Sequence, residues 1–148
     1  MTRLTRSQLF VPASKPAMIR KAAASAADAV CIDLEDSVTP AEKEPSRANV
    51  IDALKEVDFG RRVRMFRINA LDTPFAYRDL VDVVEAAGDR IDVVMIPKVG
   101  SARDVQFVDM LLTQIEGNMR LTRPIGLEAQ IETASGFIHA SEIASASP

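Results

Sequence analysis

The stretch that decides the fold is residues 125–134, Ile-Gly-Leu-Glu-Ala-Gln-Ile-Glu-Thr-Ala. It begins as an apolar, strand-like run and presents a carboxylate, Glu132, where the run ends. In parallel α/β folds the carboxyl ends of the strands face the active-site crevice or the mouth of a barrel. Glu132 is therefore predicted to lie where a metal ion or a substrate can reach it.

Four earlier apolar runs end in the same way, with polar or turn-forming residues directly after them: 9–11 before Pro12, 30–34 before Glu35, 65–68 before Asn69, and 93–96 before Pro97 and Lys98. The segments between the runs have helical composition or periodicity: 17–27, 40–57, 74–88, 101–117 and, after the last run, 137–144. Strands that alternate with helices predict βα repeats, and right-handed crossovers make the sheet parallel.

Both a doubly wound open sheet and a barrel fit such repeats. No Gly-x-Gly-x-x-Gly or Walker A sequence follows any run, so the nucleotide-binding open sheets lose their main support. Short strands with polar ends fit a (β/α)8 TIM barrel at least as well. A full barrel takes about 250 residues. Residues 1–148 are therefore predicted to form an incomplete barrel of about the first five βα units, the N-terminal part of a single TIM-barrel catalytic domain.

Composition and charge exclude several classes of function. Eighteen basic and 21 acidic residues give a net charge of −3, which provides no positive field for a nucleic-acid backbone. No apolar run approaches the ~20 residues that span a bilayer, and no signal-peptide core is visible, so we expect a cytoplasmic protein without membrane contact. The one cysteine, Cys31, lies in an apolar run and is predicted to be a buried, unreactive thiol.

Charged residues beside three of the runs could form a site. Asp33 and Glu35 share one face of a strand, and two such carboxylates require a cation, a metal ion or a proton. Arg67, near the end of the third run, can offer a planar fork to a carboxylate or to a developing oxyanion. Lys98 follows the fourth run. A buried ion-pair network that only holds a barrel together is the other reading, but the shared place of these residues at strand ends favours a site.

Five motifs stand in order along the chain: Arg-Ser-Gln-Leu-Phe-Val-Pro-Ala-Ser-Lys-Pro at 6–16, Ile-Asp-Leu-Glu-Asp-Ser-Val at 32–38, Arg-Ile-Asn-Ala-Leu-Asp-Thr-Pro-Phe at 67–75, Ile-Pro-Lys-Val at 96–99 and Ile-Glu-Thr-Ala at 131–134. Together they resemble the citrate lyase β-subunit-like (HpcH/HpaI aldolase) family. Within that family they are most similar to the L-malyl-CoA/β-methylmalyl-CoA lyases. The resemblance runs from about residue 5 to the last residue.

The resemblance implies a TIM-barrel lyase that uses Mg²⁺, with Mn²⁺ as a possible substitute. Such an enzyme cleaves a 3-hydroxyacyl-CoA thioester, malyl-CoA or β-methylmalyl-CoA, to glyoxylate and acetyl-CoA or propionyl-CoA. It also implies a homo-oligomer with small-molecule partners.

The resemblance also implies roles for individual residues. Glu132 matches the glutamate of the family's Ile-Glu-Ser/Thr motif, a direct metal ligand. Arg67 matches the arginine of its Arg-Ile-Asn motif, which contacts the glyoxylate or thioester oxygen. Glu35 and Asp36 would be outer partners of the metal waters or of Arg67.

Three further residues fall on positions that hold coenzyme A in the family. Phe10, Lys15 and Lys21 match positions that contact the thioester and the phosphates. Lys15 stands where relatives often have arginine, which keeps the charge but loses the bidentate fork.

The sequence departs from the family's pattern because it ends after the fifth predicted strand and the start of the next helix. Relatives continue through three more strands, with a second metal-binding aspartate after the fifth strand and a C-terminal acidic residue that reaches a neighbouring subunit. With one carboxylate, Glu132, Mg²⁺ binding is expected to be weak. The first and fifth strands would be unpaired edges, so self-association is also expected.

Three alternatives stay open. The first is a citryl-CoA or citryl-ACP lyase of the citrate lyase β-subunit type. The second is a Schiff-base aldolase in which Lys98, at a strand end, is the nucleophile. The third is a truncated, non-catalytic chain that binds coenzyme A without turnover.

Overall fold

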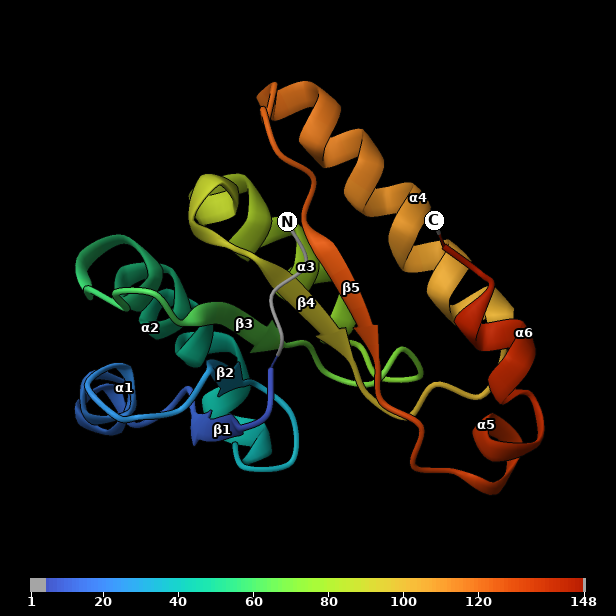
Figure 1. The fold of residues 1–148 in the computed structure, drawn as a ribbon, viewed down its shortest axis with the longest axis horizontal. Coiled ribbons are helices and arrows are strands. Elements are labelled where there is room, and N and C mark those ends of the chain that lie inside the picture. The colour runs from blue at the N-terminus through green and yellow to red at the C-terminus, as the bar shows by residue number, and fades with distance from the viewer. Residues whose placement is uncertain (1–4, 148) are drawn as a thin grey trace.

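The computed structural model describes residues 5–147, which form one parallel sheet with helices against it (Figure 1). The strands are β1 (Gln8–Pro12), β2 (Ala29–Asp33), β3 (Val63–Arg67), β4 (Val93–Ile96) and β5 (Gly126–Ala129). The helices are α1 (Pro16–Ala23), α2 (Lys43–Glu56), α3 (Ala76–Ala87), α4 (Ala102–Met119), α5 (Ala134–Ile138) and α6 (Ala140–Ala144). Short 3₁₀ turns, η1 (Pro40–Glu42) and η2 (Gly88–Arg90), adjoin α2 and α3.

The strand order in the sheet is the order in the sequence, β1-β2-β3-β4-β5, and every pair is parallel. Each of the first four strands leads into a helix, and α1, α2, α3 and α4 contact one another in sequence order. Adjacent parallel strands joined by helices on one side are the arrangement of successive βα units in a TIM barrel. The prediction of five βα units of such a barrel is confirmed.

A side-chain contact shows that the sheet is strongly curved. The Gln8 amide on β1 donates hydrogen bonds of 3.2 Å to both carboxylate oxygens of Glu128 on β5 and lies 3.1 Å from the sulfur of Met65 on β3. Four strand spacings would separate β1 from β5 by about 19 Å in a flat sheet. Because both side chains meet on one face, that face is concave.

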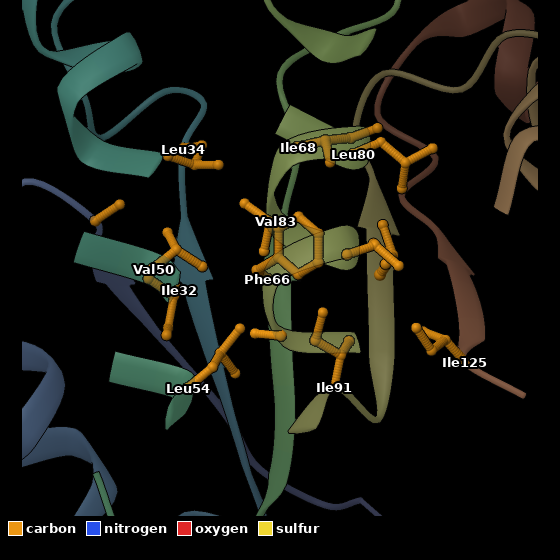
Figure 2. Packing of buried hydrophobic residues seen from close by; sticks show 14 of the residues in the cluster. Ile32, Leu34, Val50, Leu54, Phe66, Ile68, Leu80, Val83, Ile91 and Ile125 are labelled. Atoms are coloured by element: carbon orange, nitrogen blue, oxygen red, sulfur yellow. The ribbon is translucent and has the colours of Figure 1, made fainter. Parts of the chain in front are cut away.

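Alternation along the strands divides the apolar residues between two faces. Ile32 and Phe66 face the helices, where they pack with Val50, Leu54 and Val83 in the main core (Figure 2). The intervening strand residues form a second, smaller cluster on the concave side: Ala29, Cys31, Val63, Met65 and Met95. The buried thiol predicted at Cys31 is thereby confirmed.

Several predicted boundaries are wrong. The helix predicted at 17–27 ends at Ala23, and the helix predicted at 137–144 is two short helices, α5 and α6, the first of which begins at Ala134. Gly117 does not end α4, which continues to Met119 and ends at Arg120 in the left-handed conformation, with φ of 55°. A Cβ at position 117 would have no neighbour within 4 Å, so this glycine lies on an open helix surface and is tolerated there. Glu132 is not a strand residue, because β5 ends at Ala129.

Among the helices of residues 5–147, none is long and apolar enough to cross a bilayer.

At the amino ends of the strands, Asp92, directly before β4, joins β3 to the segment before β5. Its carboxylate accepts a 2.9 Å hydrogen bond from the Arg64 backbone N–H, a second of 2.9 Å from Nε of Arg64, and one of 2.6 Å from Nη1 of Arg123. Burial alone would raise the pKa of Asp92, but these hydrogen bonds, those from Arg64 first, lower it to about 2.

Asp92→Asn should therefore lower the free energy of unfolding at pH 7 by about 1–2 kcal/mol. Because the folded-state pKa is depressed, this contribution is complete above the ordinary aspartate pKa near 4 and is lost as the pH falls toward 2. Urea unfolding of both proteins from pH 7 to pH 2 checks this. Asp89→Asn, which breaks only a solvent-exposed ion pair with Arg90, is the control and should change stability little. A difference between parent and Asp92→Asn that stays constant down to pH 2 would contradict the assignment.

Candidate active site at the carboxyl ends of the strands

Asp33 and Arg67 are the last residues of β2 and β3, and they are directly paired in the parallel register. The arginine Nε lies 2.7 Å from Oδ1 of Asp33, and Nη2 lies 2.8 Å from Oδ2. Both side chains are buried. Parallel strands in register thus place a bidentate arginine–carboxylate pair at the edge of the sheet where TIM-barrel active sites form.

The Asp33 carboxylate is held from a second side. The Glu35 backbone N–H donates to Oδ1 at 2.8 Å, and the Ser37 hydroxyl and backbone N–H donate to Oδ2. Burial alone would raise the pKa of Asp33, but the hydrogen bonds from Arg67 and Ser37 hold it below its usual range. For Arg67, burial alone would lower the pKa, but Asp33 raises it. Both groups are therefore ionised at neutral pH.

The remaining contacts of Arg67 come from three other segments. Its Nη1 donates to Oε1 of Gln130 at 3.0 Å and lies 3.2 Å from Oε2 of Glu35. The guanidinium lies 5.3 Å from the centre of the Phe10 ring, a cation–π distance. The fork is thus fixed in orientation by contacts from β1, from the segments after β2 and β5, and from Asp33.

Glu35 connects Arg67 to a second cation. The Lys98 ammonium forms an ion pair with Oε1 of Glu35 and lies 3.1 Å from Oδ1 of Asp36. Glu35 is buried, whereas the Asp36 side chain is 61% exposed. Both of the predicted outer residues therefore lie in the charged cluster, and Glu35 contacts Arg67 directly.

The surroundings of Lys98 bear on the Schiff-base alternative. Hydrogen bonds to Glu35, and then to Asp36, raise the pKa of Lys98, and the bond from Lys98 lowers the pKa of Asp36. A Schiff-base lysine must lose its proton to attack a carbonyl, which burial or a neighbouring cation promotes. Two carboxylates have the opposite effect, so the site opposes this mechanism.

Glu132 lies in the loop after β5, three residues beyond the end of the strand. The chain first stays beside β4, since the Gln130 N–H donates to the Ile96 carbonyl at 2.9 Å and the Val99 N–H donates to the Gln130 carbonyl at 3.2 Å. It then presents the Glu132 carboxylate to the Lys98 backbone N–H, at 2.9 Å. The loop after β4 therefore positions the carboxylate that the sequence assigned to the strand itself.

The single carboxylate of Glu132 suits a hard cation that keeps much of its water. Among residues 5–147, no three acidic, histidine or cysteine side chains gather as a metal-binding group. Mg²⁺ is commonly bound through one or two carboxylates, with water and substrate completing an octahedron. Glu132 is exposed and accepts the Lys98 N–H on one oxygen, which leaves lone pairs for such an ion.

The three residues predicted to contact coenzyme A are near the first βα unit. Phe10 lies on β1 against Arg67 and is 39% exposed. Lys15 precedes α1, Lys21 lies in its last turn, and both are exposed. The structure thus brings Phe10 together with the charged cluster, while the two lysines lie on α1 and the loop before it.

Sequence reasoning missed two contacts at this edge. Gln130 contacts Arg67, and its place two residues before Glu132 on an alternating segment is a signal that could have identified it. The Lys43 ammonium, at the start of α2, donates to the Leu34 and Glu35 carbonyls at 3.1 and 2.8 Å. No sequence pattern indicates that second contact, because it depends on how α2 packs.

Known proteins resemble this chain over nearly all of its length. It is 54% identical to the L-malyl-CoA/beta-methylmalyl-CoA lyase of Cereibacter sphaeroides over 146 residues, 99% of this chain and 46% of the relative. It is 42% identical to the citrate lyase subunit beta of Leuconostoc mesenteroides subsp. cremoris, over 98% of this chain and 47% of the relative. The chain thus spans about half the length of the curated relatives it matches.

Solved structures are also similar to this chain over nearly all of its length. The protein CitE from Mycobacterium tuberculosis, in complex with magnesium, acetoacetate and coenzyme A, matches with a TM-score of 0.75 and 35% identity over 99% of this chain and 47% of that chain. RipC from Yersinia pestis matches with a TM-score of 0.70 and 31% identity over 97% of this chain and 54% of that chain. The profile described as HpcH/HpaI aldolase/citrate lyase matches residues 6–148, and the chain belongs to that family.

Proposed function

We propose that this chain carries Arg67, Glu132 and the coenzyme A contacts of a Mg²⁺-dependent carbon–carbon lyase. Its substrate would be a 3-hydroxyacyl-CoA, malyl-CoA or β-methylmalyl-CoA, cleaved to glyoxylate and acetyl-CoA or propionyl-CoA. The observation that carries the proposal is the Arg67 guanidinium, fixed by Asp33 and Glu35 at the edge of the sheet where the next loops present Lys98 and Glu132. The higher identity to a malyl-CoA lyase than to a citrate lyase subunit supports this substrate class.

The chemistry requires a cationic donor that is already in place. When the substrate hydroxyl loses its proton, the carbon–carbon bond breaks to give the oxo acid and the enolate of the shorter thioester, which then takes up a proton. Negative charge grows on the thioester oxygen during this step. A guanidinium that is permanently charged and held by several contacts can meet that charge without reorganising.

The Glu132 carboxylate would hold Mg²⁺, with water and the oxo acid as the remaining ligands. When bound, such an ion polarises the oxygens of the oxo acid and offsets its charge. The contribution of the chain is to orient the carboxylate through the Lys98 N–H.

Coenzyme A would lie along the first βα unit. Lys15 and Lys21 present exposed ammonium groups that suit phosphates. The Phe10 ring offers apolar surface beside Arg67 to the thioester end. A chain that binds coenzyme A without cleaving malyl-CoA would instead favour the non-catalytic alternative.

Glu132→Gln should weaken the binding of Mn²⁺, used as a spectroscopic substitute for Mg²⁺, by at least about tenfold, the loss seen even when an outer-shell partner of a metal is removed. Glu142→Gln, on α6, is the matched control and should leave the affinity unchanged. Electron paramagnetic resonance of free Mn²⁺ measures both. Equal affinity of the parent and Glu132→Gln would contradict the metal assignment.

Arg67→Ala should lower the Mg²⁺-dependent release of glyoxylate from malyl-CoA by roughly a hundredfold or more, the usual effect of removing one oxyanion donor. Arg67→Lys should recover only part of this activity, because an ammonium cannot replace the bidentate fork. Arg64→Ala, at the other end of β3, is the control for losing an arginine ion pair and should retain turnover. Circular dichroism checks that each variant is folded.

Two outcomes would contradict parts of the proposal, the first the role of Arg67 and the second the substrate class. Activity of Arg67→Ala within tenfold of the parent would remove it as an oxyanion donor. A parent protein that releases no glyoxylate from malyl-CoA, but does cleave a citryl thioester, would move the substrate to the citrate lyase class.

A further inference from the structure

Lys98 has an uncommon backbone conformation for its position. It is one of two non-glycine residues with positive φ among residues 5–147, with φ of 52° at Lys98 and 55° at Arg120. Arg120 ends α4, where a left-handed residue is ordinary. Lys98 instead follows β4 and the buried Pro97 in a loop that does not end a helix. Residues with a Cβ disfavour this conformation, so it persists only where the surroundings impose it.

The backbone N–H of Lys98 in this conformation reaches Glu132. The N–H donates to Oε1 of the carboxylate at 2.9 Å. Glu132 is otherwise an exposed glutamate on a loop, with several freely rotating side-chain bonds. The hydrogen bond therefore restricts the direction in which the carboxylate points.

The side chain of Lys98 is anchored at its other end. Its ammonium forms ion pairs with Glu35 and with Asp36, the latter at 3.1 Å. Glu35 in turn lies 3.2 Å from Nη1 of Arg67. Lys98 thus contacts Glu132 through its backbone and, through its side chain, Glu35, which also contacts Arg67.

The rest of the loop is held by packing that does not involve Lys98. Gly136 lies so close to the Val99 carbonyl that a Cβ could not be accommodated there. The Ser135 hydroxyl donates to the Gly100 carbonyl at 3.0 Å. These contacts fix the loop after Lys98 against the segment that carries Glu132. Lys98 therefore lies between this fixed part of the loop and the carboxylates that hold its ammonium.

We propose that Lys98 is a positioning residue, whose ammonium, anchored on Glu35 and Asp36, holds its backbone in the left-handed conformation that orients the metal-binding carboxylate of Glu132. This role rests on the proposed function, since it takes Glu132 as a metal ligand. It also makes the position of Glu132 depend on Glu35, the carboxylate that Arg67 contacts.

Three substitutions separate the side-chain anchor from the backbone conformation. Lys98→Met removes the ammonium and keeps the penalty for the left-handed conformation, so Mn²⁺ should bind about tenfold more weakly. Lys98→Gly also removes the ammonium but adopts positive φ freely, so its affinity should exceed that of Lys98→Met. Lys98→Arg keeps a cation and should bind Mn²⁺ with nearly the affinity of the parent.

Arg120→Met is the matched control, because it makes the same kind of change at the other left-handed position, after α4. It should leave the Mn²⁺ affinity unchanged. Electron paramagnetic resonance of free Mn²⁺ gives the affinities, and circular dichroism confirms folding. If Lys98→Met does not fold, Lys98→Gly and Lys98→Arg still decide, since the inference requires the arginine variant to bind Mn²⁺ more tightly.

The outcomes distinguish this inference from the proposed function. If Lys98→Met binds Mn²⁺ as tightly as the parent, or Lys98→Gly binds no more tightly than Lys98→Met, the inference is overturned while the metal site stands. If the parent shows no Mn²⁺ binding that depends on Glu132, both the proposed function and the inference are overturned.

Discussion

The arrangement at the carboxyl ends of the strands depends on the buried ion pair between Asp33 and Arg67. Removing one partner of a buried pair typically costs about 3–5 kcal/mol, because the other charge is left without compensation. Here the parallel register of β2 and β3 brings the two residues together, and the Ser37 hydroxyl and two backbone N–H groups complete the carboxylate's hydrogen bonds. Because the Asp33 carboxylate is fully hydrogen-bonded in this way, it holds the Arg67 guanidinium in place. The remaining contacts of the guanidinium are directed toward Phe10, Gln130 and Glu35.

Around this pair the charges alternate in sign. Asp33 contacts Arg67, Arg67 contacts Glu35, and Glu35 contacts Lys98, which also contacts Asp36. Each buried charge therefore has an opposite charge beside it, which is the condition under which ionised groups remain stable away from water. The same alternation keeps Lys98 protonated, which is why a lysine at a strand end does not by itself indicate a Schiff-base enzyme.

Much of the fold could be predicted from the sequence, because it depends on local patterns. Apolar runs separated by helical segments gave the βα order, and the buried position of Cys31 followed from its apolar neighbours. Less of the candidate site could be predicted from the sequence. Arg67 and Glu35 could be grouped from their places at strand ends, but the position of Glu132 beyond β5 and the left-handed backbone of Lys98 depend on how two loops pack together. The helix predicted to end at residue 117 continues to Met119, because a glycine such as Gly117 ends a helix only when its backbone conformation requires it.

The sequential strand order also bears on how the chain acquires its structure. Each strand pairs with the strand before it, so every pairing step closes a loop of only one βα unit, and loop-closure entropy grows slowly with such short separations. Short pairing steps of this kind keep the sequence separation between contacting strands low, which is the property associated with faster folding. The hydrogen bond from Gln8 to Glu128 is different, because it joins residues 120 positions apart. It can form only after β5 has joined the sheet, so it marks the completion of folding for these five strands.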